Sequence, residues 1–205
     1  MEVMCAVSLL MMFIVLCASA MVPVARIMLR LRRTLEAQII ADSVLESVRA
    51  EVEEAREYIR IEPYAGGEGA DLPCEGGAVE FVNNDGCIMR VATGGTEAAE
   101  AGRLLYRYCA AGTPETGTEY AVFPEGFYTG LYLGLRFSPV LEDGLLMYLK
   151  ITAQLGKGVG NAGEGPVLRD VICTESVIAD LRYATVLEDG VRVKVGLALN
   201  PSGTD

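Results

Sequence analysis

Histidine and tryptophan are both absent from this 205-residue sequence. Without an imidazole, the chain can build neither a histidine-ligated metal site nor a Ser/His or Cys/His nucleophile pair. Most hydrolase chemistry is therefore excluded, and no constellation of paired carboxylates stands out among the acids. We expect a protein that is not an enzyme and that holds no metal and no cofactor.

Glycine is absent from the first 60 residues, and all 23 glycines follow them. Seven of the eight prolines also come after residue 60, whereas six of the eight methionines come before it. Such a contrast indicates two different structures on one chain. We predict a helix whose membrane-spanning half covers residues 1–25 and whose amphipathic half covers residues 26–60. A β-rich globular head then occupies residues 61–205.

Positive charge is scarce after residue 60, where ten Lys and Arg face twenty Asp and Glu, a balance of −10. Residues 26–60 carry seven arginines and seven acids, so with Glu2 the net charge is −11. Nucleic-acid binding rests largely on Lys and Arg that displace counterions from phosphates. We therefore predict no nucleic-acid partner.

Charge is missing altogether from residues 3–25. As a helix, this run of 23 residues reaches roughly 34 Å, enough to cross the hydrocarbon core of a lipid bilayer. Pro23 is expected to kink the helix without ending it, because no turn residue accompanies it. The residues that we expect to form this membrane stem are Val3, Val7, Leu10, Phe13, Leu16 and Pro23.

An amphipathic pattern follows the apolar run. Apolar residues at positions 24, 28, 31 and 35, and again at 45, 48, 52, 55 and 59, recur at spacings of three and four. This periodicity predicts a helix with one apolar face. We expect the helix to continue to about Arg60 and to end at Glu62-Pro63 and Gly66-Gly67.

Three interpretations compete for the apolar run. The Ala18-Ser19-Ala20 sequence fits the cleavage site of a secretory signal peptide, but Glu2 stands where such peptides carry lysines. An ordinary membrane anchor is the second interpretation. In that case Arg26, Arg30, Arg32 and Arg33 favour a cytoplasmic C-terminal side by the positive-inside rule.

The third interpretation is a family resemblance. Met1-Glu2-Val3-Met4, then an apolar run, then an amphipathic helix with early arginines resembles the N-terminus of type IV pilins and pseudopilins. Precursors of that family carry a basic leader and the motif G-F-T-L-x-E before such a helix, and Met1-Glu2-Val3 corresponds to the end of that motif. The Gly, Phe, Thr and Leu are lacking here, so the resemblance implies that the leader and these four residues precede Met1. A restored basic leader would hold the N-terminus in the cytoplasm.

The resemblance implies an architecture and a function. The expected fold is α+β, with the long N-terminal helix packed on an antiparallel sheet in the head. Its function is that of a structural subunit, a minor pilin or pseudopilin, in a type IV pilus or a type II secretion-like filament. Glu2 would meet the N-terminal amine of a neighbouring subunit and set the register of assembly. The implied partners are other pilin-like subunits, the lipid bilayer, a membrane assembly platform and the prepilin peptidase that precedes N-terminal methylation.

The alternative function belongs to a different class. A secreted or bitopic membrane-anchored protein would use a β-rich ectodomain to bind a ligand. The pilin-like interpretation places a single-pass protein in the cytoplasmic membrane with its head outside, and later in a cell-surface or periplasm-spanning filament.

Short apolar runs separated by turn residues predict strands in the head. Asp143-Gly144 and Asp189-Gly190 favour hairpin turns. The sequence of residues 174–181 is compatible with either a strand or a short helix. The strands are expected at residues 78–82, 87–92, 104–109, 120–123, 127–137, 145–153, 167–173 and 191–199.

Two candidate ligand motifs are weak. Residues 158–163 have the spacing G-x-G-x-x-G, but Glu164-Gly165-Pro166 follows where a helix should receive a pyrophosphate, so a hairpin loop is favoured. The acidic turns at 83–86, 142–144 and 188–190 lack the alternate acid spacing of a calcium loop, so solvated turns are favoured.

Cysteine usage is the last signal. Cys5 and Cys17 lie in the apolar run, where they are expected to act as small hydrophobic residues. The head has four cysteines, an even number, which can form disulfides in three different pairings. Disulfides are expected if the head is extracytoplasmic, and buried thiols are the alternative. The head cysteines are Cys74, Cys87, Cys109 and Cys173.

Overall fold

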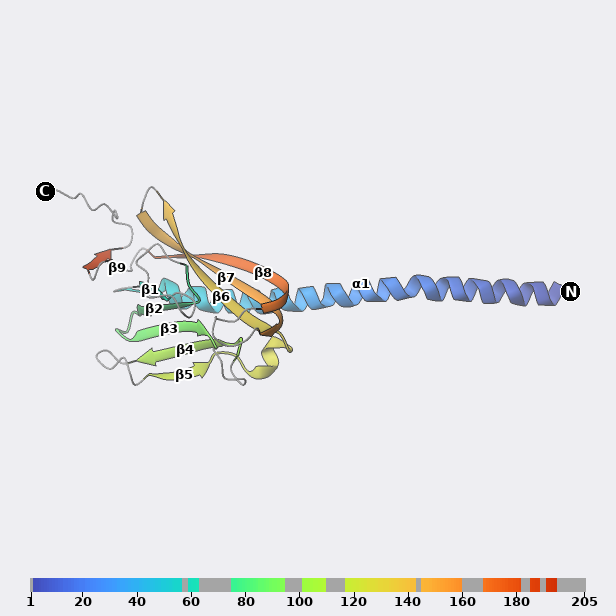
Figure 1. The fold of residues 1–205 in the computed structure, drawn as a ribbon, viewed down its shortest axis with the longest axis horizontal. Coiled ribbons are helices and arrows are strands. Elements are labelled where there is room, and N and C mark those ends of the chain that lie inside the picture. The colour runs from blue at the N-terminus through green and yellow to red at the C-terminus, as the bar shows by residue number, and fades with distance from the viewer. Residues whose placement is uncertain are drawn as a thin grey trace. The chain divides into compact units, whose positions relative to one another are not determined.

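The computed structural model describes the greater part of the chain (Figure 1). The residues that it describes are 2–56, 59–62, 75–94, 101–109, 117–142, 145–159, 168–181, 185–188 and 191–194. Contacts divide the chain into two compact units, Met1–Glu36 and Ala37–Asp205. The fold is α+β, with one long helix and two sheets of largely antiparallel strands.

The helix α1 spans Glu2–Glu53. It was expected to continue to Arg60, and that expectation is wrong, because Ile59–Glu62 forms strand β1. In β1 the two isoleucines, Ile59 and Ile61, are buried and Arg60 is exposed, which is the two-residue alternation of a strand. The spacing from Ala55 to Ile59 fits a helix equally well, and pairing with β2 decides the outcome.

The larger sheet has seven strands in the order β10-β9-β1-β2-β3-β4-β5. Neighbouring strands pair antiparallel, except that β1 and β9 pair in parallel through Ile59 and Val186. Its strands after β1 are β2 (Ala78–Val82), β3 (Ile88–Thr93), β4 (Leu104–Cys109), β5 (Thr118–Ala121), β9 (Thr185–Glu188) and β10 (Val191–Lys194).

The smaller sheet has three longer strands in the order β6-β7-β8. They are β6 (Tyr132–Glu142), β7 (Leu145–Val159) and β8 (Leu168–Asp180), and both pairs are antiparallel. The segment 174–181 is therefore mainly strand, since β8 continues through it to Asp180. One sheet was expected, and two are found.

The segment 127–137 was expected to be one strand, and that prediction is wrong at its start. A 3-10 helix, η2, spans Glu125–Tyr128, and β6 begins only at Tyr132. Thr129 and Gly130 lie between the two elements with φ of 49° and 78°. A strand cannot pass through two left-handed residues, so the chain turns there.

The ends of two strand pairs lie next to the Asp-Gly dipeptides of the sequence. Glu142 pairs with Leu145 and Glu188 pairs with Val191 in antiparallel strands, whereas the Asp-Gly dipeptides themselves lie outside the described residues. In the β2–β3 connection, the buried Asn83 side chain accepts hydrogen bonds from the Asp85 and Cys87 amides at 3.1 and 2.9 Å. Side-chain acceptance of this kind stabilises a tight turn.

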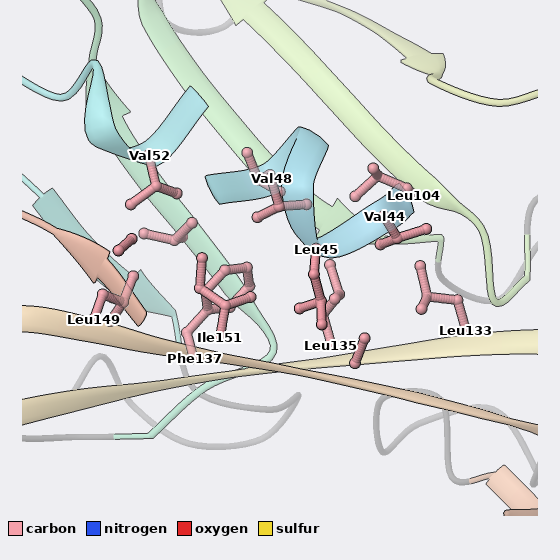
Figure 2. Close-up of a cluster of buried hydrophobic side chains, with 14 of the residues drawn as sticks. Val44, Leu45, Val48, Val52, Leu104, Leu133, Leu135, Phe137, Leu149 and Ile151 are labelled. Carbon is pink, nitrogen blue, oxygen red and sulfur yellow. The ribbon is translucent and has the colours of Figure 1, made fainter. Parts of the chain in front are cut away.

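The core of the head combines side chains of α1 with side chains of both sheets (Figure 2). The buried residues of α1 recur at spacings of three and four from Ala37 onward, as expected for one apolar face. The first part of the expected apolar face is not buried, since the residues at positions 24, 28, 31 and 35 are exposed. Among the labelled residues of Figure 2, α1 contributes Val44, Leu45, Val48 and Val52, β4 contributes Leu104, β6 contributes Leu133, Leu135 and Phe137, and β7 contributes Leu149 and Ile151.

Candidate functional site

The apolar first part of α1 is the candidate site. The helix contains an 18-residue window with a mean hydropathy of 2.5, and none of that window is buried. A helix of this length and composition is long and apolar enough to cross a membrane. The stem residues Val3, Val7, Leu10, Phe13 and Leu16 are all exposed large apolar side chains.

The polar side chains within the run are satisfied by the helix itself. The Ser8 hydroxyl donates to the Met4 carbonyl at 2.8 Å, and the Ser19 hydroxyl donates to the Leu16 carbonyl at 2.8 Å. A hydroxyl bonded to the preceding turn needs no partner from water. The run can therefore enter an apolar environment without leaving these hydroxyls unsatisfied.

Pro23 lies inside α1, and the helix continues past it to Glu53. The prediction that this proline does not end the helix is confirmed. A proline has no amide hydrogen, so the turn before it lacks one backbone hydrogen bond. Membrane helices tolerate such a position when neighbouring helices or side chains satisfy the freed carbonyl.

Glu2 is the first residue of α1, and the position of its side chain is outside the described part of the chain. An acid in the first turn of a helix interacts favourably with the partial positive charge of the helix N-terminus. The register role of Glu2 stays a prediction.

The boundary of the apolar run is charged. Arg26, Arg30 and Arg33 are exposed, and Arg32 forms an exposed ion pair with Glu36 at 2.8 Å. Arginines at the end of an apolar helix can extend their charged ends to the headgroup region of a bilayer. The apolar run is therefore followed directly by a group of exposed positive charges.

Sequence reasoning missed an exposed apolar residue within the head-bound part of α1. Ile39 is 66% exposed, whereas its neighbour Ile40 is 5% exposed. Successive residues on a helix point in directions about 100° apart, and Ile39 lies outside the sector in which Ile40, Ala41 and Val44 face the core. The pair of adjacent isoleucines in the sequence could have indicated that one of them lies outside the buried face.

The described cysteines of the head lie at separate places in the chain fold. Cys109 is buried in β4, Cys173 is buried in β8, and Cys87 is half-buried before β3. Cys74 lies outside the described residues, so any pairing that involves it is untested. Cys87 and Cys173 are thiols in the structure.

The Cys173 thiol is poorly suited to exchange chemistry. Burial raises its pKa, and the nearby carboxylates of Glu175 and Asp42 raise it further. The thiolate, not the thiol, is the nucleophile, so the raised pKa of Cys173 lowers its reactivity relative to that of an ordinary cysteine.

The weak ligand motifs gain no support from the described residues. Gly158 and Val159 end strand β7, and residues 160–163 of the glycine motif lie outside the described part. Within the described ranges, no three His, Cys, Asp or Glu side chains are grouped to hold a metal ion.

The chain matches no protein-family model, no curated protein and no solved structure.

Proposed function

We propose that this chain is a pilin-like structural subunit, of the minor pilin or pseudopilin kind, in a type IV pilus or a type II secretion-like filament. One observation supports the proposal above the others. An unbroken helix, α1, presents exposed apolar side chains along residues 3–25 and belongs to the buried core of the head from Ala37 onward.

The exposed stem requires an apolar environment. Removing apolar surface from water stabilises by roughly 25 cal/mol per Å², and the exposed side chains of the stem are almost all apolar. A bilayer covers such a helix before assembly. In a filament, stems of neighbouring copies take the place of lipid through close van der Waals packing.

Glu2 supplies the polar contact of the assembly. A carboxylate in an apolar environment is costly unless a positive charge pairs with it. The N-terminal amine of a neighbouring copy offers that charge. Because the cost is removed only at one axial offset, the pair fixes the register of neighbouring stems.

The proposed location is the cytoplasmic membrane with the head outside, followed by a filament at the cell surface or across the periplasm. The assembly platform and the leader peptidase are the partners that this route requires. A basic leader upstream of the stem would hold the N-terminus in the cytoplasm against the opposite preference of the arginines at 26–33.

The substitution Glu2→Ala tests the proposal. The variant should insert into membranes as the unchanged chain does and should be reduced at least tenfold in the sheared-filament fraction. The matched control is Glu36→Ala, which removes an exposed acid of the same helix that pairs only with Arg32 among the described residues. The control should enter filaments normally.

Two outcomes count against the proposal. If Glu2→Ala enters filaments as well as Glu36→Ala does, Glu2 is only a flanking residue. If neither chain appears in any sedimentable filament while both are found in membranes, the membrane-anchored ligand-binding alternative is favoured.

A further inference from the structure

A pocket of about 330 Å³ lies in the head where the β5–β6 connection meets the start of β4. The residues of its wall that matter chemically are Arg103, Glu125, Tyr128, Leu131 and Tyr132. Two phenol rings and one leucine give the wall its apolar part, and one guanidinium and one carboxylate give it its charges.

Backbone geometry holds the pocket in shape. Gly102 has φ of 66°, and a Cβ at this position would lie 2.8 Å from the Cβ of Tyr132. The Gly102 carbonyl accepts a hydrogen bond from the Leu133 amide at 2.7 Å, and the Tyr128 carbonyl accepts one from Leu131 at 2.8 Å. The wall is therefore fixed before any ligand arrives, which lowers the entropic cost of binding.

Tyr128 anchors the pocket to strand β4. Its ring is buried, and its hydroxyl accepts a hydrogen bond from the Leu104 amide at 2.9 Å. Burial raises the pKa of the Tyr128 phenol, so the group is neutral near pH 7. Arg103 and Glu125 are the oppositely charged residues of the wall, and they form an ion pair.

These two charges differ sharply in exposure. The Arg103 side chain is 22% exposed, and its Nη2 lies 2.9 Å from the Glu125 Oε1, whereas the Glu125 side chain is 83% exposed. A pair with one partner almost fully in water is weak, because water competes for the carboxylate. Glu125 can leave at little cost, while Arg103 stays in the pocket wall.

We propose that this pocket binds a carboxylate carried on a small apolar or aromatic body, with the ligand carboxylate taking the place of Glu125 at Arg103. A guanidinium matches a carboxylate through two parallel hydrogen bonds. Leu131 and Tyr132, which are half-buried, provide apolar contacts for the body of the ligand, and the buried Tyr128 forms part of the wall. The inference concerns the head alone and does not depend on the assembly of α1.

Benzoate is a suitable probe, since it combines a carboxylate with one ring. Titration of the full chain in detergent micelles, followed by amide NMR shifts, should show saturable binding at one site. Arg103→Gln should weaken binding at least tenfold. Glu125→Gln should tighten it severalfold, because the competing carboxylate has gone.

The matched control is Arg136→Gln. Arg136 is an arginine of β6 that pairs with Glu75, and it is not among the pocket residues. This control changes the net charge as Arg103→Gln does and should leave benzoate affinity unchanged. Since Glu125 is exposed, Glu125→Gln tests the pocket even if Arg103→Gln fails to fold.

A free carboxylic acid and an acidic side chain of another copy offer the same chemistry. Sedimentation of the chain with and without saturating benzoate separates these sources. If benzoate dissociates oligomers of the unchanged chain but not of Arg103→Gln, the ligand of the pocket is an acidic side chain of another copy. If benzoate leaves the sedimentation of the unchanged chain as it is, the ligand is a free carboxylic acid. The proposal is overturned if benzoate does not saturate, if both arginine variants respond alike, or if Glu125→Gln weakens binding.

Discussion

Helix α1 contains two stretches of similar side chains with opposite surroundings. Val15 is 66% exposed and Val48 is 0% exposed, although both are valines in the same helix. From Ala37 onward, polar residues separate the apolar positions and one face enters the core of the head. Between Val3 and Ala25 nothing polar marks a face, apart from the two self-bonded serines. The head supplies the surroundings of the second stretch, whereas the first stretch needs lipid or other copies of the chain.

The largest effect should come from a charge placed in each stretch. Val48→Asp buries a carboxylate in the core, which costs several kcal/mol and should unfold the head. Val15→Asp should leave the unfolding transition of the head unchanged and instead impair membrane insertion, at a cost of about 3 kcal/mol. Circular dichroism in detergent and membrane fractionation measure the two effects. The comparison fails if Val15→Asp melts the head as Val48→Asp does.

Leucine truncation should give the next largest difference. Leu135, on β6, is 1% exposed and Leu10 is 60% exposed. Leu135→Ala should lower the free energy of unfolding of the head by about 2–5 kcal/mol, because it leaves a cavity. Leu10→Ala should change it by no more than the error of a urea titration. Equal losses would mean that the stem belongs to the folding unit of the head.

Ion pairs should give the smallest difference. Arg90 donates two hydrogen bonds to the Glu62 Oε2, at 2.8 and 3.0 Å, and its side chain is only 24% exposed. Arg90→Gln should lower head stability by about 1–2 kcal/mol, since charged hydrogen bonds shielded from water are the stronger kind. Arg32→Gln removes the exposed pair with Glu36, and this loss should be too small to measure in the free energy of unfolding of the head. The same urea titration checks both variants, and an equal effect would contradict the assignment.

Local sequence signals predicted much of the fold. Strands β2 and β4 occupy the expected residues, and antiparallel strands end on either side of each Asp-Gly position. Local patterns failed where pairing at a distance decides the structure. Ile59 fits a helix or a strand by spacing, and only its pairing with Phe81 of β2 makes it strand.

The stem could be predicted from the sequence, whereas the pocket could not. A charge-free run is visible in the sequence, so the stem was predicted residue by residue. The pocket depends on left-handed backbone at Gly102 and Gly130 and on an ion pair between Arg103 and Glu125, two residues that lie far apart in the sequence. No local pattern brings such residues together.

The most direct test of the contrast between stem and head uses the native cysteine of the stem. Cys17 is exposed in the structure, and Asp42, on the same helix, is exposed in the head. Membranes opened by freezing and thawing are treated briefly with a bulky water-soluble maleimide, for the unchanged chain and for Asp42→Cys, and labelled peptides are mapped. We predict that Cys17 is labelled only after denaturation, whereas the cysteine of Asp42→Cys is labelled at once. Equal labelling of the two positions would show that water surrounds the stem and would contradict this account.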